Sequence, residues 1–488
     1  MDQSFIIKGN AMNLNTSNYQ KFLTSMAFGI GNKVGIWKIA LPVIEKVAQR
    51  VLFKQLSSES NDSKREYQDR FFMKFNVLRA ALKAYGKGAP AVRNCIQNLF
   101  IRQLLGPGIQ QTKDRFRSKY GISPPGFMTI SPEGCCNLKC HNCYAASIQG
   151  SLPRLSKEVF GKILDEKYNV WGSWFNVISG GEPFIWRDGN TDLIDMAKQY
   201  QDQFFMVYTN GTLIDKQKAK RMAEAGNISP ALSVEGFEKE TDERRGKGTH
   251  KLILQAFENL REAGVPFGIS VTATAQNAEI LLNDDLIDFY FDKQGAIYQW
   301  VFQYMPIGRG ADTRNQISPE IRKKIWFKEH EWVCKRRLLI ADFWNGGTFV
   351  SGCIAGGRAD GYLYVDWTGN VYPCVFVPYW KDNIHDLYSK GKSLTDALFS
   401  DLFQGWRDWQ HSYSLNVPLE RRGNLIRPCL MRDHHDCARD VLLSTGAKPG
   451  NSSAEICLSD KSYKNALKEY DKELAVQLDP IWNNKYKA

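Results

Sequence analysis

The sequence predicts an α/β protein in which a partial (β/α)6 TIM-like barrel follows an N-terminal helical region. From about residue 127, six strand-like runs alternate with helix-like segments, as in a parallel sheet that curls into a barrel. Before that point, apolar residues recur at helical spacing. We therefore divide the chain into a basic helical region (1–120), the barrel (121–340), a turn-rich region with four cysteines (341–445) and a helical tail (446–488).

The N-terminal region carries the positive charge of the chain. Residues 1–120 contain 20 Lys and Arg but 7 Asp and Glu, a net +13, whereas the whole chain has +12. Loops or helix ends are expected at 57–63, 86–90 and 106–108. One face of a first helix is formed by Val43, Ile44, Val47 and Val51, and the stripe of a second by Tyr67, Phe71, Phe75, Leu78 and Leu82.

The barrel strands are expected at 127–131, 175–179, 204–208, 231–234, 267–274 and 300–305. Helices are expected at 157–167, 215–225, 252–263, 321–337 and 459–475. The functional residues of such barrels lie at the carboxyl ends of the strands. The motifs described below all follow strands in this way.

Cysteine usage indicates a reducing compartment and metal binding. The chain has eleven cysteines, which are clustered, and its first residues lack the pattern of a secretory signal. A cytoplasmic protein without disulfides is therefore expected. No run of about 18 apolar residues predicts a membrane-spanning helix.

Three cysteines follow the first predicted strand at short spacing. Cys136, Cys140 and Cys143 form a C-x3-C-x2-C pattern. Three thiolates on one loop can hold three irons of a [4Fe–4S] cluster and leave the fourth iron open. The alternative is a zinc knuckle, for which His141 offers a fourth ligand.

This triplet resembles the signature of the radical S-adenosylmethionine (SAM) superfamily. A segment like that family's GGEP motif ends the second strand, at Gly180, Gly181, Glu182 and Pro183. In the family this segment binds the amino group of SAM. Two adjacent glycines let the backbone approach a ligand closely.

Further matches come in the order of the family's motifs. Asn210 ends the third strand and Ser233 the fourth, and both are expected at the SAM site. Arg245 resembles the arginine that pairs with the SAM carboxylate, with Arg244 as the rival for that role. Tyr304 and Met305 resemble the stretch that passes the adenine; the alternative is that they belong to the barrel core.

One position departs from the family pattern. Many members have an aromatic residue just before the third cysteine, where this chain has Asn142. Tyr144 directly follows Cys143 and is a possible substitute against the adenine. Cys135 does not fit the register and is expected to be a bystander.

The resemblance implies a specific chemistry. SAM chelates the open iron, and one electron from the reduced cluster cleaves it into methionine and a 5′-deoxyadenosyl radical, which takes a hydrogen atom from the substrate. The electron is expected from a reductant such as ferredoxin or flavodoxin. The protein orients the cofactor and excludes water. No motif assigns a catalytic acid or base.

A second cluster is expected in the turn-rich region. Cys353, Gly369 and Cys374 form a C-x15-G-x4-C pattern, which resembles the start of the auxiliary-cluster domains called SPASM and twitch. In those domains a hairpin carries two ligands, and a turn signal at 368–370 supports a hairpin here. The remaining ligands are expected to be Cys429 and Cys437, so the domain would hold one auxiliary [4Fe–4S] cluster.

The fourth ligand of that cluster has competitors. Asp433, His434 and His435 lie between Cys429 and Cys437 and are alternatives to Cys437. A zinc site is the alternative to a cluster. Three further cysteines stand alone and are expected to be buried structural thiols, namely Cys95, Cys334 and Cys457.

The substrate is not encoded in any of these motifs. Apolar faces beside Lys and Arg in the N-terminal region favour a lipid or membrane-associated substrate, with the protein peripheral to an anionic membrane surface. The patch gives no strong nucleic-acid signal. The first alternative is a peptide-modifying maturase whose basic patch receives an acidic leader peptide. An alternative of another class is a non-catalytic Fe–S electron carrier or scaffold, against which the motifs that resemble a SAM site argue.

Overall fold

The computed structural model describes residues 36–55, 63–105, 107–150, 152–415 and 417–488. The chain divides into two units, Met1–Glu59 and Ser60–Ala488. In the first unit the described part is one helix, α2 (Ile36–Gln55), which contains Pro42. This confirms the first predicted helix. The predicted loop at 57–63 falls outside the described residues except for Ser63.

The second unit begins with three helices. These are α3 (Lys64–Lys87), α4 (Pro90–Leu105) and α5 (Pro107–Tyr120). A capping box starts α3, because Ser63 accepts from the Glu66 backbone and Glu66 accepts from the Ser63 backbone. Gly88 ends α3 and Pro90 starts α4, as the sequence predicts. Most of the predicted stripe of α3 is buried, namely Phe71, Phe75, Leu78 and Leu82.

One ten-stranded sheet forms the centre of this unit. Its strands are β1 (Phe127–Glu133), β2 (Phe175–Gly180), β5 (Phe204–Thr209), β6 (Ile228–Ser233), β7 (Gly268–Ala273), β8 (Gln299–Gln303), β9 (Ile340–Asp342), β10 (Tyr362–Val365), β11 (Asn370–Tyr372) and β13 (Asp382–Asn383). Their order is β13-β11-β10-β1-β2-β5-β6-β7-β8-β9. The six predicted strands correspond to β1, β2, β5, β6, β7 and β8. Each of them pairs in parallel with the next in that order. The predicted α/β barrel class is confirmed.

Two parts of the sheet differ from the prediction. β6 starts at Ile228, before the predicted start at residue 231, and includes Pro230. Proline has no N–H to donate to a neighbouring strand, which is why the sequence favoured a strand that begins after it. The predicted hairpin exists as the antiparallel pair β10 and β11, but β10 also pairs in parallel with β1. The barrel strands and the cysteine-bearing hairpin therefore share one sheet.

Helices alternate with the barrel strands. They are α6 (Lys157–Asn169), α7 (Leu193–Gln199), α8 (Lys216–Ala225), α9 (Glu238–Arg245), α10 (Thr249–Ala263), α11 (Asp284–Asp288) and α12 (Pro319–Cys334). Two short two-stranded sheets lie outside the main one. One is formed by β3 (Arg187–Asp188) with β4 (Thr191–Asp192), and the other by β12 (Tyr379–Trp380) with β14 (Lys448–Pro449).

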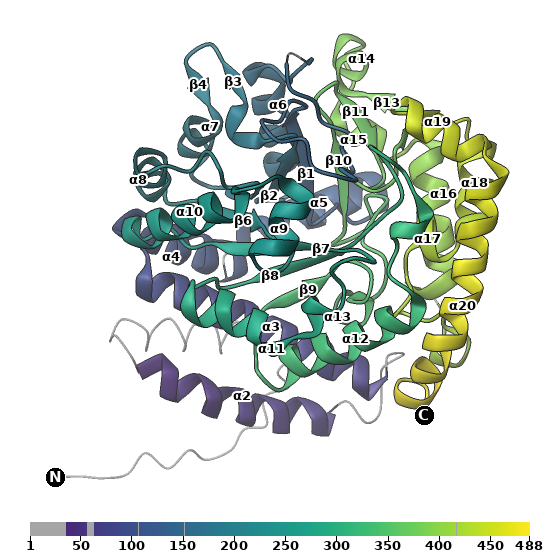
Figure 1. The fold of residues 1–488 in the computed structure, drawn as a ribbon, viewed down its shortest axis with the longest axis horizontal. Helices are drawn as coiled ribbons and strands as arrows, with labels where there is room; N and C mark the ends of the chain where they lie inside the picture. The colour runs from purple at the N-terminus through teal and green to yellow at the C-terminus, as the bar shows by residue number, and fades with distance from the viewer. Residues whose placement is uncertain (1–35, 56–62, 106, 151, 416) are drawn as a thin grey trace. The chain divides into compact units, whose positions relative to one another are not determined.

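The C-terminal part is mostly helical. Its helices are α13 (Gly347–Val350), α14 (Ile384–Ser389), α15 (Leu394–Ala397), α16 (Asp401–Gln410), α17 (Leu430–Asp433), α18 (His435–Ser444), α19 (Ser452–Ser459) and α20 (Lys461–Lys485). In Figure 1 the yellow helix α20 runs along α17 and α18. It extends ten residues beyond the predicted end, through Pro480, because Trp482 and Tyr486 pack with Trp326 in a buried cluster. Within the described ranges, none of the helices has the length and hydropathy needed to cross a bilayer.

Candidate functional site

The cysteine triplet lies at the carboxyl end of β1. Cys136, Cys140 and Cys143 line a cavity of about 210 Å³ at the carboxyl ends of the barrel strands. Most of the other residues predicted for the SAM site line the same cavity, namely Gly180, Gly181, Asn210, Ser233, Arg245, Tyr304 and Met305. The fold therefore brings together residues that are up to 169 positions apart.

The segment after β8 holds the cysteine loop in place. Arg309 donates from Nη1 to the Cys140 carbonyl and from its backbone N–H to the Cys143 carbonyl, both at 2.9 Å. Its Nη2 donates to the Ser147 carbonyl. A Cβ at Gly308 would overlap the carbonyls of Cys143 and Tyr144, so only glycine allows this approach. The sequence interpretation of this stretch as an adenine contact missed its role in positioning the loop.

The local backbone explains the departure at Asn142. This residue has φ of 54°, in the left-handed region that asparagine tolerates better than aromatic residues do. Tyr144 lines the cavity, and its burial raises the pKa of its hydroxyl to about 12. Tyr144 thus directly follows the triplet in sequence and places an aromatic ring in the wall of the cavity.

The GGEP-like segment makes the tightest backbone contact of the site. A Cβ at Gly181 would overlap the Cys135 carbonyl, and Gly180 has φ of 126°. Both positions therefore require glycine. The carboxylate of Glu182 accepts from Thr209 Oγ1 at 2.8 Å and from the Asn210 N–H at 2.8 Å.

Glu182 is consequently a link between β2 and β5. It also accepts from the Phe184 N–H at 3.1 Å, at the start of a short 3₁₀ turn (Pro183–Ile185). Burial raises the pKa of this carboxyl, although these three donors lower it in part. Neither Glu182 nor Pro183 is among the described residues that line the cavity, so both act by shaping the turn.

Two arginines share one carboxylate at the end of α9. Arg244 Nη1 and Arg245 Nη2 both donate to Glu235 Oε1 at 2.5 Å. Both arginines line the cavity, so both remain candidates for the partner of the SAM carboxylate. Arg244 Nε is buried and has no hydrogen-bond partner. Arg245 is the arginine whose charge acts most strongly on Cys140.

Polar side chains complete the cavity wall. Asn210 Nδ2 donates to Asn137 Oδ1 at 2.8 Å and to Cys136 Sγ at 3.8 Å. Ser233 shares a hydrogen bond of 3.1 Å with Ser270. Tyr304 and Met305 are both 2% exposed, so they are at once cavity wall and barrel core.

Three of the four predicted auxiliary ligands meet at a second cavity. Cys353, Cys374 and Cys429 line this cavity, which measures about 450 Å³. The hydroxyl of Tyr362 lies 2.9 Å from Cys374 Sγ. Cys437 does not belong to this group: it is exposed and is not among the described residues that line the cavity. Cys437 lies in the first turn of α18, on the exposed side of that helix. The spacing of the cysteines in the sequence does not reveal this placement.

Each of the other candidates for a fourth ligand makes at least one hydrogen bond or ion pair within the protein. Asp433 forms a fully buried double ion pair with Arg322, with N–O distances of 2.6 and 2.9 Å. His434 Nε2 lies 3.0 Å from the Arg427 carbonyl. His435 Nδ1 lies 3.0 Å from the Met431 carbonyl, and its Nε2 is buried without a partner.

Comparisons with known proteins support the resemblance that the cysteine triplet indicates. A family model described as the radical SAM superfamily matches residues 130–279, which include the triplet and the GGEP-like segment. Residues 130–279 therefore form a radical SAM domain. Proteins of this superfamily use a [4Fe–4S] cluster and SAM, so the protein is an enzyme of the radical SAM type and the alternative of a non-catalytic electron carrier is not supported.

Several relatives are similar to this radical SAM enzyme over much of their length. Mycofactocin maturase MftC of Mycolicibacterium smegmatis is 29% identical over 302 residues, which cover 60% of this chain and 72% of that protein. AdoMet-dependent heme synthase of Methanosarcina barkeri is 29% identical over 282 residues, 51% and 77% of the two chains. Streptococcus suis SuiB bound to precursor peptide SuiA has the same fold with a TM-score of 0.50 at 18% identity, over 65% of this chain and 74% of that one.

The residues fit the clusters that the family implies. Besides Arg244 Nε at the first cavity, the indole N–H groups of Trp344 and Trp406 are buried without partners, and both residues line the cavity of the auxiliary cysteines. Buried unpaired donors are costly unless an acceptor is present. Cluster sulfurs are such acceptors, because hydrogen bonds to them are common in Fe–S proteins.

Thiol spacing counts against the zinc alternatives. Ligands of one zinc ion lie about 2.0–2.3 Å from it, and therefore within about 4 Å of one another. In the described part of the chain, one group of His, Cys, Asp and Glu has all its ligand atoms within 4.8 Å, and it consists of Asp69, His330 and Cys334. Neither set of predicted cluster cysteines has this single-ion spacing.

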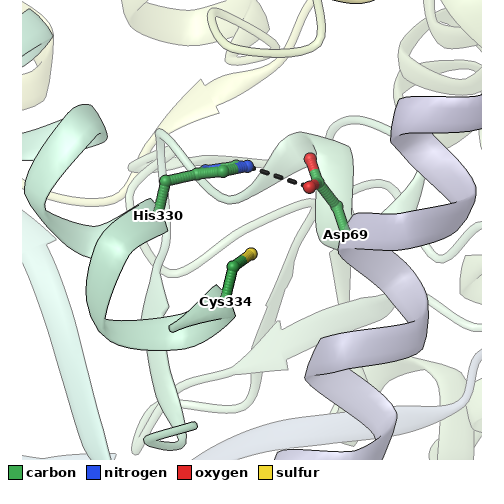
Figure 2. A group of neighbouring side chains, drawn as sticks. All are labelled: Asp69, His330 and Cys334. Carbon is green, nitrogen blue, oxygen red and sulfur yellow. Dashed lines mark hydrogen bonds and ion pairs between the residues drawn. The ribbon is translucent and has the colours of Figure 1, made fainter. Parts of the chain in front are cut away.

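The group formed by Asp69, His330 and Cys334 is a polar contact between α3 and α12 (Figure 2). Asp69 Oδ1 lies 2.9 Å from His330 Nε2 and 3.3 Å from Arg65 Nε, and Tyr486 donates to Oδ2 at 2.6 Å. The carboxylate thus already has three partners, one of them a cation. Burial raises the pKa of Cys334 to about 12, so it stays a thiol. These contacts join α3, α12 and the end of α20.

The remaining thiols are separate from both cysteine groups. Cys95 and Cys457 are buried, as predicted. Cys135 is also buried, and its Sγ donates to the Gly150 carbonyl at 2.9 Å. Its carbonyl, not its sulfur, takes part in the site through the contact with Gly181.

Proposed function

We propose that this radical SAM enzyme modifies a peptide, the reading that the sequence alone placed second. When bound, the first cluster and SAM supply a carbon-centred radical that removes a hydrogen atom from the substrate. The cysteines at 136, 140 and 143 would hold that cluster, and Arg245 with Arg244 would hold the SAM carboxylate. The similarity to mycofactocin maturase MftC, which extends over 72% of that protein, supports this proposal.

The chemistry of the cavity carries the proposal. Beyond the SAM-binding edge, its wall is mostly aromatic, with Phe127, Phe175, Tyr208, Trp300, Phe302, Phe343, Tyr362 and Phe376. Among the described residues that line it, the charged side chains are Arg244 and Arg245, and both are bonded to Glu235. Such a wall suits an uncharged side chain of a peptide and keeps water from the reacting carbon.

The small number of charged residues in the cavity argues against a tetrapyrrole substrate, which the heme synthase relatives suggest. A heme carries carboxylates, and their burial requires cationic partners. The two arginines of this cavity are already needed for SAM. An uncharged aliphatic or aromatic side chain needs no such partner.

The auxiliary cysteines lie directly behind the aromatic wall. Phe376 lines both cavities, and Cys374 is two residues away from it. An auxiliary cluster held by Cys353, Cys374 and Cys429 would be placed to exchange an electron with the substrate. A ferredoxin or flavodoxin would supply the electron that starts the reaction.

A lipid or membrane-associated substrate remains the second candidate. It rests on the net charge of +13 in residues 1–120. Anionic vesicles attract such a segment by about 1 kcal/mol per Lys or Arg near the surface. A protein bound at the periphery of a membrane would follow from it.

One assay separates these candidates. Anaerobically reconstituted enzyme is incubated with dithionite and SAM, and 5′-deoxyadenosine is measured in three arms. The arms contain a pool of peptides with acidic leaders and aliphatic or aromatic cores, anionic phospholipid vesicles, and an iron porphyrin with free carboxylates. We expect the peptide pool to raise 5′-deoxyadenosine above the substrate-free rate and one peptide to change in mass. Stimulation by vesicles or porphyrin alone would contradict the proposal.

A further inference from the structure

Arg358 is a buried cation on the loop that follows the first auxiliary cysteine, Cys353. It is 7% exposed. Its guanidinium donates from Nε to the Cys353 carbonyl at 2.6 Å, from Nη2 to the Val350 carbonyl at 2.8 Å and from Nη1 to the Ala359 carbonyl at 3.0 Å. All of these partners are neutral, and in the part of the chain that the structure describes no carboxylate forms an ion pair with this arginine.

A buried guanidinium of this kind calls for a counter-charge, because arginine stays protonated and buried charges in proteins are paired. Burial lowers the pKa of Arg358, and the charges of Cys353 and Asp360 raise it in part, Cys353 the more strongly. Asp360 is a poor counter-charge, since its side chain is 81% exposed and pairs with Lys113 at 3.3 Å. The strongest anionic neighbour of Arg358 is therefore the thiolate form of an auxiliary cysteine.

The other charges behind the auxiliary cysteines pair with one another. Asp433 forms ion pairs with Arg322 at 2.6 Å and with Arg432 at 3.2 Å. Asp342, which lines the cavity, lies within reach of the charge of Arg322. Burial raises the pKa of Glu329 well above its ordinary value, so this carboxyl is neutral. These two arginines and two ionised acids balance, and none of them compensates the charge on the Cys353 loop.

We propose that Arg358 is a positioning residue of the auxiliary cluster, which fixes the Cys353 loop and raises the reduction potential of the cluster through its positive charge. A [4Fe–4S] cluster with thiolate ligands is anionic and becomes more so on reduction, and its potential depends on the charges around it. A buried cation beside one ligand stabilises the reduced form more than the oxidised form, which favours uptake of an electron. The proposal rests on the auxiliary cluster of the proposed function and is independent of the substrate.

Arg407 offers a matched control for the charge. It is also buried, and its Nη1 donates to the carbonyl of Gly356 on the same loop at 3.1 Å. Burial lowers the pKa of Arg407, and the charge that raises it in part is that of Asp408, with no contribution from a cysteine. Arg407 thus holds the same loop without acting on a thiolate.

The test is a redox titration of the anaerobically reconstituted full-length protein, followed by electron paramagnetic resonance. SAM binds at the first cluster, so its addition identifies the signal of that cluster. Arg358→Met should shift the reduction equilibrium of the auxiliary cluster at least tenfold toward the oxidised form, about 59 mV for one electron, and leave the first cluster unchanged. Arg358→Lys keeps the charge, and Arg407→Met removes the control arginine. Each should shift the equilibrium of the auxiliary cluster less than threefold.

Iron content separates the ways in which the proposal can fail. About four irons in the wild type would contradict the auxiliary cluster itself, and with it this proposal. About eight irons and an unchanged potential in Arg358→Met would overturn the role of Arg358 alone. An equally large shift in Arg358→Lys or Arg407→Met would do the same, because loop geometry and not charge would be its cause. If Arg358→Met loses the auxiliary iron, Arg358→Lys decides: a full cluster with the wild-type potential supports the proposal, and loss of iron there too overturns it.

Discussion

Asn210 Nδ2 lies 3.8 Å from the Sγ of Cys136, so a residue at the end of β5 donates a hydrogen bond to a proposed cluster ligand. The Leu138 N–H donates to the same sulfur at 3.4 Å. Asn210 is oriented for this contact by Asn137, whose Oδ1 accepts from the same amide at 2.8 Å. Hydrogen bonds to ligand sulfur stabilise the reduced cluster, which carries more negative charge. The role of Asn210 at this site is therefore electrostatic as well as structural.

Asn210→Leu removes this donor and keeps the size of the side chain. We expect the midpoint potential of the first cluster to fall by roughly 30–60 mV, which corresponds to about 1 kcal/mol of lost hydrogen bonding. A redox titration followed by electron paramagnetic resonance measures it. Asn137→Leu removes the amide that orients Asn210 but keeps the donor itself, so we expect a smaller shift. Equal shifts in the two variants would contradict the assignment.

Iron content tests both cysteine sets. Two [4Fe–4S] clusters give about eight irons per chain. Replacement of Cys136, Cys140 and Cys143 by Ala should leave about half the iron and abolish 5′-deoxyadenosine formation. Replacement of Cys353, Cys374 and Cys429 should remove the other half.

Cys437→Ala should keep the full iron content, because Cys437 is exposed and apart from the other three. Iron and zinc are measured together by mass spectrometry. A triple variant at the first set that still cleaves SAM would overturn the site assignment. Loss of iron in Cys437→Ala would restore it as the fourth ligand.

The contact between Gly181 and the Cys135 carbonyl predicts a steric effect. A Cβ at Gly181 overlaps backbone that cannot move aside cheaply, so Gly181→Ala should displace the GGEP-like segment. We expect SAM affinity to fall about tenfold or more while the iron content is kept. Gly108→Ala, where the added methyl meets nothing within 4 Å, is the control and should bind SAM normally. Isothermal titration under anaerobic conditions measures both.

Arg244 and Arg245 can be separated by substitutions that keep the charge. Arg245→Lys loses the guanidinium fork that suits a carboxylate, and we expect SAM affinity to fall about tenfold or more with the cluster intact. Arg244→Lys should have a smaller effect, since its Nη2 also faces the Asn142 carbonyl at 3.4 Å. If the larger loss belongs to Arg244→Lys, the carboxylate partner is Arg244.

The sequence predicted the barrel well because its signals are local. Each strand is a short apolar run followed by a motif, and helical spacing marks what lies between. The pairing of β10 with β1 was not predictable, since it joins segments 235 residues apart and no local pattern encodes it. Pro230 within β6 shows the converse, because tertiary pairing overrides a local breaker.

The site was predictable where a motif specifies chemistry and less so where packing decides. The triplet and Gly181 follow from spacing and from close backbone approach. The role of Arg309 in holding the loop depends on a contact across 169 residues, for which the sequence has no signal. The separation of Cys437 from the other auxiliary thiols depends on which face of α18 is outward, and four cysteines in one region do not reveal that.

The last prediction concerns the polar contact between α3 and α12. Burial alone would raise the pKa of Asp69, but the charge and hydrogen bond of His330, with Arg65 and Tyr486, lower it overall. A carboxyl whose folded-state pKa lies below its unfolded value of about 3.9 contributes stability that is complete above that pH and is lost as the pH falls through the folded-state pKa. The Asp69 carboxylate therefore contributes fully at pH 7.5. Asp69→Asn leaves buried partners unpaired, and we expect a loss of about 3 kcal/mol and an apparent Tm lower by a few degrees in a thermal scan. Asp114→Asn, whose ion pair with Arg117 is more than half exposed, should leave the Tm unchanged. An unchanged Tm for Asp69→Asn would mean that this contact does not hold α3 to α12.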